Sequence, residues 1–494
     1  MFVIAFLAPL FTAPHAQAFA LLGPYADWMT GTNGYSFDIG GPMNIGEGYR
    51  WNVPVVTYAF DQSFVDAFGT NGIAAVESAI AILNNLPPAS QLDPSNYPLY
   101  TIKQNFRAAA QSLIDLKSTT LSLLVQQLGL SEPTRYTYAL HDFSVTNGEA
   151  TGNFVQRNFD PFSLAPTNSV NGVSYNHFLQ DPTTFDGVVY DGWANLPLNS
   201  TDPFYTAVAD LPLITPTDFG SFAAQLTRDD VGGLRYLLRP DNFAFERLLP
   251  DVHGAGTNLN NYVNLAFRAG VDKITFVRQD YDPLTGQAYT PQTNDFIDAY
   301  VTNNTLVHQQ LERVVSKPDF IFSAFEPVGN NIYLCTGTSN WLNNSALNQN
   351  ADGEGPGTIP PPVNISFPKY GLVYDVETAD DYPNSALSTF IARWGSFDDS
   401  TNPPVVFADS VASQINTLEV VFSMLNTNSD GFGATFYWNL PLNYGEAATL
   451  QTSKDLVNWA PQTTITNYGM PTYWQHYYSA PQGFFRVVPQ TNSP

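Results

Sequence analysis

Charged residues are scarce in this chain of 494 residues, and basic residues are the scarcest. Only 13% of the residues are Asp, Glu, Lys or Arg, which is about half the usual share for a soluble protein. Lys and Arg number 19 against 44 Asp and Glu, so the formal net charge is -25. Nucleic-acid backbones and anionic lipid surfaces are bound through basic patches. The composition therefore argues against both kinds of partner.

Cysteine is almost absent. Cys335 is the single one, so no disulfide can form within the chain. Residues 331–336 around it are strand-like, which favours a buried structural thiol over a reactive thiol or a disulfide between chains. A secreted chain without disulfides is typical of bacteria rather than animals.

Long hydrophobic runs are also lacking. Residues 2–11 are apolar but too short, and too rich in proline, for a membrane-spanning helix. They precede Ala16-Gln17-Ala18, a small-x-small site typical of signal-peptide cleavage. The basic residues that usually open a signal peptide are missing, so a retained apolar arm over residues 1–24 is the alternative. We expect a secreted, extracellular protein with no membrane span.

Familiar catalytic motifs are missing as well. The chain has no G-x-S-x-G elbow, no G-x-G-x-x-G turn and no P-loop, and only six histidines. A non-enzymatic role is favoured, and a hydrolase with a site unmarked in the sequence is the alternative.

The chain does contain enough apolar and aromatic residues, 44% and 14%, for two to four folded domains. Residues 53–60 are typical of a buried strand. Residues 71–86 and 101–128 carry apolar residues three and four apart, which predicts two helices. Thr227, followed by two acidic residues, predicts the start of another helix.

Two segments resemble parts of secreted matrixin-like metalloproteases of the metzincin group. Residues 51–61 (WNVPVVTYAFD) are similar to their opening strand, and residues 227–237 (TRDDVGGLRYL) to their closing helix. The resemblance implies a metzincin-like α+β domain over residues 25–248.

The zinc site of that family is missing, however. The family carries H-E-x-x-H, a third His and a Met-containing turn. Between residues 51 and 239 this chain has only His141 and His177, and no Met lies between Met43 and Met424. A three-histidine zinc site cannot be assembled from two histidines, so zinc protease activity is predicted to be absent.

Residues 249–362 predict a second α/β unit that ends in a Pro-rich linker. Its expected elements are a strand at 273–278, a helix at 294–317, and strands at 320–322 and 332–334.

In residues 363–494 the apolar residues no longer recur at the three- and four-residue spacing of a helix. Short strand-like runs at regular spacing predict an antiparallel β-sandwich. Residues 450–459 (LQTSKDLVNW) and 483–487 (GFFRV) resemble a C-terminal module of large secreted proteins of environmental bacteria. That resemblance implies export and an accessory role.

Two loops match the first half of an EF-type calcium loop, with oxygen ligands at positions one, three and five and Gly at six. The Glu expected at position twelve is replaced by Ile359 and Tyr437, so ordinary Asn- and Gly-rich turns are the alternative. The calcium candidates are Asn348, Asn350, Asp352, Asn426, Asn428 and Asp430. No other cofactor is predicted.

The remaining polar clusters have a functional and a structural interpretation, and the structural one is favoured. His308 and Glu312 lie four apart in a predicted helix and could share a metal, but they lack a third ligand. Acid–base chemistry and glycan stacking would use other candidates. These are His141, Asp142, His177, Asp229/Asp230, Asp380/Asp381, Asp398/Asp399, Trp438, Trp459 and Trp474.

The leading functional hypothesis is a non-catalytic structural protein that self-assembles, as a homo-oligomer of cyclic symmetry, into an extracellular particle or surface layer. A polysaccharide- or peptide-binding protein on an inactive protease scaffold is the alternative, besides the unmarked hydrolase.

Overall fold

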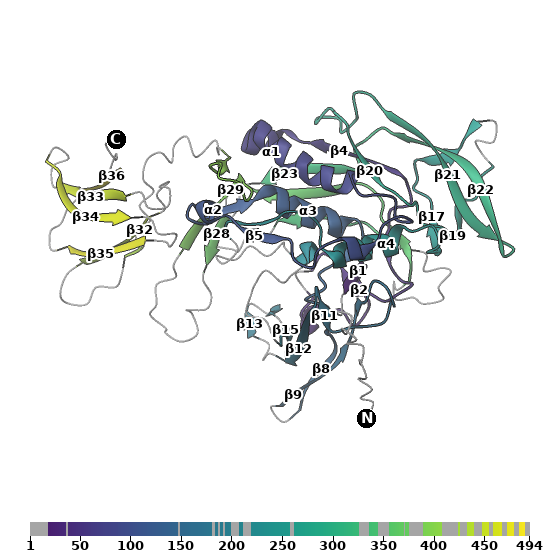
Figure 1. Cartoon of the computed structure of the whole chain (residues 1–494), viewed down its shortest axis with the longest axis horizontal. Coiled ribbons are helices and arrows are strands. Elements are labelled where there is room, and N and C mark those ends of the chain that lie inside the picture. Colours follow the sequence, from purple (N-terminus) through teal and green to yellow (C-terminus); the bar gives the residue numbers. More distant parts are fainter. Residues whose placement is uncertain are drawn as a thin grey trace, which may run out of the picture.

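A computed structural model shows a mixed α+β fold with many small, mostly antiparallel sheets and few helices (Figure 1). The predicted α+β class is confirmed. The structure describes residues 18–35, 38–146, 149–179, 183–185, 188–190, 193–198, 207–210, 219–256, 261–325, 335–343, 355–369, 371–374, 389–407, 423–424, 432–438, 447–453, 458–466, 472–478 and 484–489. Over these residues, no helix has the length and apolar character needed to span a bilayer.

The central sheet combines strands from all three predicted units. Its order is β20-β4-β23-β27-β24, with the first four strands parallel and β24 antiparallel. The strands are β4 (Val55–Phe60), β20 (Thr275–Arg278), β23 (Phe320–Phe325), β24 (Thr336–Gly337) and β27 (Val363–Pro368). Because β27 pairs with β23 over its whole length, the prolines before it do not separate two domains. The central sheet therefore runs across the boundaries expected at residues 248 and 362.

Several elements lie where the sequence predicts them. The strands expected at 53–60, 273–278 and 320–322 are β4, β20 and β23. The helix expected at 71–86 is the greater part of α1 (Gln62–Asn84), which packs against β23. α4 (Arg228–Leu238) begins at Thr227 with a reciprocal capping box to Asp230.

The helix predicted over residues 101–128 is wrong in its first half. The chain there forms β5 (Ile102–Gln104), the single turn α2 (Phe106–Ala109), β6 (Leu113–Asp115) and then α3 (Leu116–Gln127). The break occurs at Asp115, whose Oδ2 accepts the Ser118 N–H at 2.9 Å and so caps α3. α3 packs beside α1 and is buried on nearly every side, polar residues included.

The helix predicted over residues 294–317 is also wrong, because this segment is a β-hairpin. β21 (Gln292–Thr302) and β22 (Thr305–Val315) pair antiparallel over 11 residues each and project on the right of Figure 1. Asn303 and Asn304 between them have φ of 49° and 58°. Positive φ at both central residues defines a type I′ turn, which matches the twist of the flanking strands.

This hairpin is the centre of a five-stranded antiparallel sheet of order β17-β19-β21-β22-β18. The other strands are β17 (Ala244–Arg247), β18 (Val252–Gly254) and β19 (Leu265–Arg268). The inner face of the sheet is buried and holds ion pairs, one of them to Arg50 of β3 (Tyr49–Arg50). The buried pairs are Arg50–Glu246, Arg268–Asp298 and Arg313–Asp319.

The apolar N-terminal segment ends inside the fold. β1 (Phe19–Gly23) is buried and pairs with three short strands. They are β2 (Gly41–Met43), β7 (Leu130–Ser131) and β10 (Asn158–Phe159). Residues 1–17 lie outside the described part of the chain.

The remaining strands before residue 408 form small sheets around this body. Three of them are two-stranded: β8 (Ala139–Thr146) with β9 (Glu149–Val155), β13 (Thr183–Phe185) with β14 (Val188–Tyr190), and β16 (Ser221–Ala223) with β5. Two are three-stranded: β11 (Ser169–Val170), β12 (Val173–Leu179) and β15 (Trp193–Pro197) form one, and β25 (Leu342–Asn343), β26 (Gly357–Thr358) and β3 form the other. The last contains β28 (Gly371–Tyr374), β29 (Thr389–Ser396) and β30 (Val405–Val406), and β6 also pairs with β29. Single 3₁₀ turns are η1 (Gly31–Asn33), η2 (Pro94–Asn96) and η3 (Val208–Asp210).

The C-terminal strands form two three-stranded antiparallel sheets, on the left of Figure 1. One has the order β31 (Ser423–Met424), β32 (Phe432–Trp438), β35 (Thr472–Tyr478); the other has β34 (Ala460–Thr466), β33 (Ala447–Ser453), β36 (Phe484–Pro489). The strands predicted after residue 430 are therefore confirmed, and their packing as a sandwich stays a prediction. The strand predicted at 332–334 lies outside the described residues.

Candidate functional site

Some predicted site residues lie outside the description. Both calcium loops (Asn348, Asn350, Asp352 and Asn426, Asn428, Asp430), the pair Asp380/Asp381, and the side chains of Trp438 and Trp474 belong to this group. Calcium binding therefore stays a prediction. Trp459 is partly buried, and Asp398 and Asp399 are exposed, with Asp399 paired to Lys103.

His308 and Glu312 do not form the pair expected of a helix. They lie on the same side of strand β22, where four residues span about 13 Å. A single metal ion cannot bridge that distance. No three His, Cys, Asp or Glu side chains come together as a metal-binding group in the described part of the chain.

His141 and His177 pack as structural residues. His141 Nδ1 lies 3.0 Å from Asp142 Oδ2 at the surface. The His177 ring packs on Phe154 with centroids 4.0 Å apart, and burial lowers the pKa of His177. Cys335 is buried, and this desolvation raises the pKa of its thiol. The burial predicted for Cys335 is confirmed.

Asp229 and Asp230 are buried at the start of α4 and accept backbone N–H groups. Asp230 binds the N–H groups of Val208 and Ala209 in η3 at 3.0 and 3.1 Å. Asp229 binds the N–H of Asn171 at 2.6 Å. Burial raises the pKa of both carboxyls. The two groups therefore tie α4 to η3 and to the loop at Asn171.

Two further carboxyls surround this region. Burial raises the pKa of Asp210 to about 7 and that of Glu132 to about 8. Asp210 Oδ1 accepts the Thr134 N–H at 3.1 Å, and its Oδ2 accepts the Ala207 N–H at 3.1 Å. These bonds are those of a structural acceptor that titrates near neutrality.

Polar side chains are also buried on α3, next to this group of carboxyls. Ser122 and Gln126 lie one helical turn apart, and Gln126 Nε2 donates to the Ala209 carbonyl at 2.9 Å. Ser122 Oγ and Gln126 Oε1 are buried with no hydrogen-bond partner among the described residues. After the helix, Gly129 turns the chain with φ of 110°.

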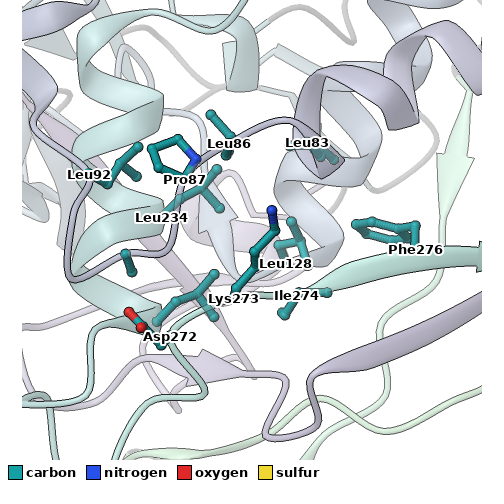
Figure 2. A pocket seen from close by; sticks show the side chains of 12 residues that line it. Leu83, Leu86, Pro87, Leu92, Leu128, Leu234, Asp272, Lys273, Ile274 and Phe276 are labelled. Atoms are coloured by element: carbon teal, nitrogen blue, oxygen red, sulfur yellow. The ribbon is translucent and has the colours of Figure 1, made fainter.

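A small apolar cavity of about 30 Å³ lies between the end of α1, α4 and β20 (Figure 2). Leu83, Leu234 and Phe276 line it, and Asp272 and Lys273 lie at its polar side. Binding pockets for small ligands have volumes of about 300–1,000 Å³. This cavity has room for about one water molecule and is a packing gap.

The most prominent candidate surface is the outer face of the β17-β19-β21-β22 sheet. Side chains alternate along each strand, and directly paired residues share a face. The register therefore aligns Phe245 with Phe267, Phe267 with Val301, and Val301 with Leu306. Phe245 and Phe267 touch edge to face with centroids 4.9 Å apart.

The apolar side chains of this outer face are strongly exposed to solvent. Ile297 is 67% exposed, Phe267 53% and Leu306 50%. Single exposed apolar residues are ordinary, whereas a contiguous exposed apolar set is typical of interaction surfaces. We define the outer face by Phe245, Phe267, Ile297, Ala299, Val301 and Leu306.

Comparison with known proteins gives no relative: no family model, no curated protein and no solved structure matches the chain.

The outer face was missed by sequence reasoning because residues 294–317 were interpreted as a helix. A usable signal is present in the sequence. Two runs of period-two alternation flank Asn303-Asn304, and a pair of residues tolerant of positive φ between such runs predicts a hairpin.

Proposed function

We propose that this protein is a non-catalytic, secreted structural protein that self-associates through the outer face into an extracellular assembly such as a particle or surface layer. The observation that carries the proposal is the exposed apolar set across β17, β19, β21 and β22. In a chain of net charge -25, two copies can approach closely only where carboxylates are absent. The apolar part of the outer face is such a place.

The proposal includes an inactive metzincin-like frame. The metzincin motif is H-E-x-x-H-x-x-G-x-x-H. Aligning its glycine with Gly129 puts Ser122, Gln126 and Glu132 at the three ligand positions and Leu123 at the position of the catalytic Glu. Ser and Gln are not zinc ligands, and one carboxylate does not hold the ion. We expect no stoichiometric zinc in the purified protein by elemental analysis, and no chelator-sensitive cleavage of casein.

Light scattering coupled to size exclusion tests the self-association. We expect the wild-type protein at micromolar concentration to have the mass of two or more copies. Ile297→Glu places a carboxylate in the middle of the outer face and should weaken association at least tenfold.

Leu284→Glu is the matched control, because Leu284 is 94% exposed on a turn outside the outer face. This variant should associate like the wild type. A wild-type protein that stays a monomer would contradict the proposed function and leave the outer face to a glycan or peptide partner, to be tested by glycan- and peptide-array binding.

A further inference from the structure

We infer that two copies of this chain pair outer face to outer face, about a two-fold axis that crosses the strands at the level of Ala299. The inference rests on the proposed self-association and names its geometry. Charged residues are distributed unevenly around the apolar centre of the outer face.

The two ends of the outer face carry opposite charge. Arg247 pairs with Leu265, two residues beyond Phe245 toward the hairpin turn, and is exposed. Asp295 and Glu312 are paired with each other at the opposite end of the hairpin.

His253 pairs with Glu312, and His308 pairs with Ala299 at the middle of the face. Along the strands the Arg247 end and the acidic end are roughly 27 Å apart, at about 3.4 Å per residue. Arg247 forms no salt bridge with the described part of the chain.

A two-fold axis across the strands brings the basic end of each copy toward the acidic end of the other, at both ends of the outer face. It brings Arg247 of each copy to the level of Asp295 and Glu312 of the other copy along the strands, two strand spacings or roughly 10 Å to the side of Asp295. It also sets Val301 of one copy against Ile297 of the second, so the apolar centre is covered. A two-fold axis along the strands would instead stack acidic end on acidic end, and like charges in contact disfavour such a pair. Isologous pairing about a two-fold axis is the commonest arrangement of homo-oligomers.

A charge exchange tests the pairing. One variant carries Arg247→Asp, and the other carries Asp295→Lys together with Glu312→Lys. Each alone brings like charges together at both ends, and we expect its dissociation constant to rise at least tenfold by sedimentation velocity. Mixed in equal amounts, the two variants restore opposite charges at both ends. The mixed pair should then form with a dissociation constant within about threefold of the wild-type value. All the substituted positions lie on the solvent side of the sheet, and circular dichroism checks that the variants fold.

The outcomes separate this inference from the proposed function. If mixing restores nothing while Ile297→Glu still dissociates the assembly, the outer face is an interface but the two-fold arrangement is wrong. If single charge variants associate like the wild type, the inference is overturned as well. If the wild-type protein is a monomer, the proposed function itself fails.

Discussion

Arg313 is the residue whose substitution we expect to lower the stability of the fold most. It is 1% exposed, and its guanidinium pairs with buried Asp319 and with Asp251. Asp319 also accepts the Thr57 N–H at 2.8 Å, so this group joins the hairpin to β4. Removing one partner of a buried pair leaves a charge without compensation in a medium of low polarity.

We expect Arg313→Ala to lower the free energy of unfolding by about 3–5 kcal/mol, measured by urea denaturation. Arg278→Ala is the control, because Arg278 pairs with Glu77 at the surface. An exposed pair contributes about 0–1 kcal/mol. Equal effects of the two substitutions would show that the Arg313 pair is not desolvated in solution.

Three desolvated carboxyls, of which Asp229 is buried and Asp210 and Glu132 are half-buried, predict an unusual pH dependence of stability. In the unfolded chain Asp and Glu titrate near pH 4. In the folded chain burial raises the pKa of Asp210 to about 7 and that of Glu132 to about 8, and raises that of Asp229. The folded state then binds more protons than the unfolded state between about pH 4 and 8. The stabilising contribution is complete below pH 4 and is lost as pH rises through 7 to 8.

The free energy of unfolding should therefore fall by a few kcal/mol between pH 5 and 8, since one pKa unit corresponds to about 1.4 kcal/mol. Asp210→Asn keeps the size and one of the two acceptor oxygens but cannot ionise, so it should flatten the curve. Because its NH2 group replaces the other oxygen, which accepts an N–H group, the variant should also be less stable at every pH. Asp66→Asn, at an exposed position, should leave the curve unchanged. A wild-type protein that gains stability between pH 5 and 8 would refute this account.

At the scale of elements, the turn of the β21–β22 hairpin fixes the register of the outer face. A type I′ turn requires positive φ at both central residues, which Asn tolerates and β-branched residues do not. We expect Asn304→Ile to lower the free energy of unfolding by about 1–3 kcal/mol, a range typical of backbone strain. Asn304→Gly should be neutral or slightly stabilising by thermal denaturation. If both variants unfold like the wild type, the turn is not of this type.

The elements predicted correctly are those whose signal is local. The N-cap at Thr227 is a property of a few neighbouring residues, and the structure has the capping box there. The apolar run of β4 likewise identifies a buried strand without knowledge of its partners.

The elements predicted wrongly depend on contacts between residues that are far apart in the sequence. In the hairpin, Ile297, Val301 and His308 fall at spacings that also fit a helix. The strand alternation that buries Asp298 and Tyr300 is not evident in the sequence, because Asp298 is buried only with its ion-pair partner Arg268, which lies on another strand. The cluster of Glu132, Asp210 and Asp229 shows the same limit, since only the fold brings these residues together.

At the scale of the whole molecule, the fold joins segments that are far apart in sequence. The central sheet takes β4, β20, β23 and β27 from residues 55 to 368. Long-range pairing of this kind leaves few places where the body could be cut into independent units. It also places the two large aromatic residues of β17 and β19 on a sheet held rigidly by ion pairs beneath it. A rigid apolar surface loses little conformational freedom on association.

Net charge decides how such an assembly responds to salt. Each copy carries -25, so two copies repel at long range, and the Debye length is about 10 Å at 0.1 M salt. Salt also weakens the attraction inferred between the oppositely charged ends of the two outer faces, but even exposed ion pairs in contact contribute only about 0–1 kcal/mol each. Burial of the apolar centre is not opposed by salt. We therefore expect the dissociation constant to fall when sodium chloride is raised from 50 to 500 mM, measured by sedimentation velocity. The Arg247→Asp variant, which lacks the attractive pairs, should gain more from salt than the wild type does. A rise in the wild-type dissociation constant with salt would mean that ion pairs, rather than apolar contact, hold the copies together.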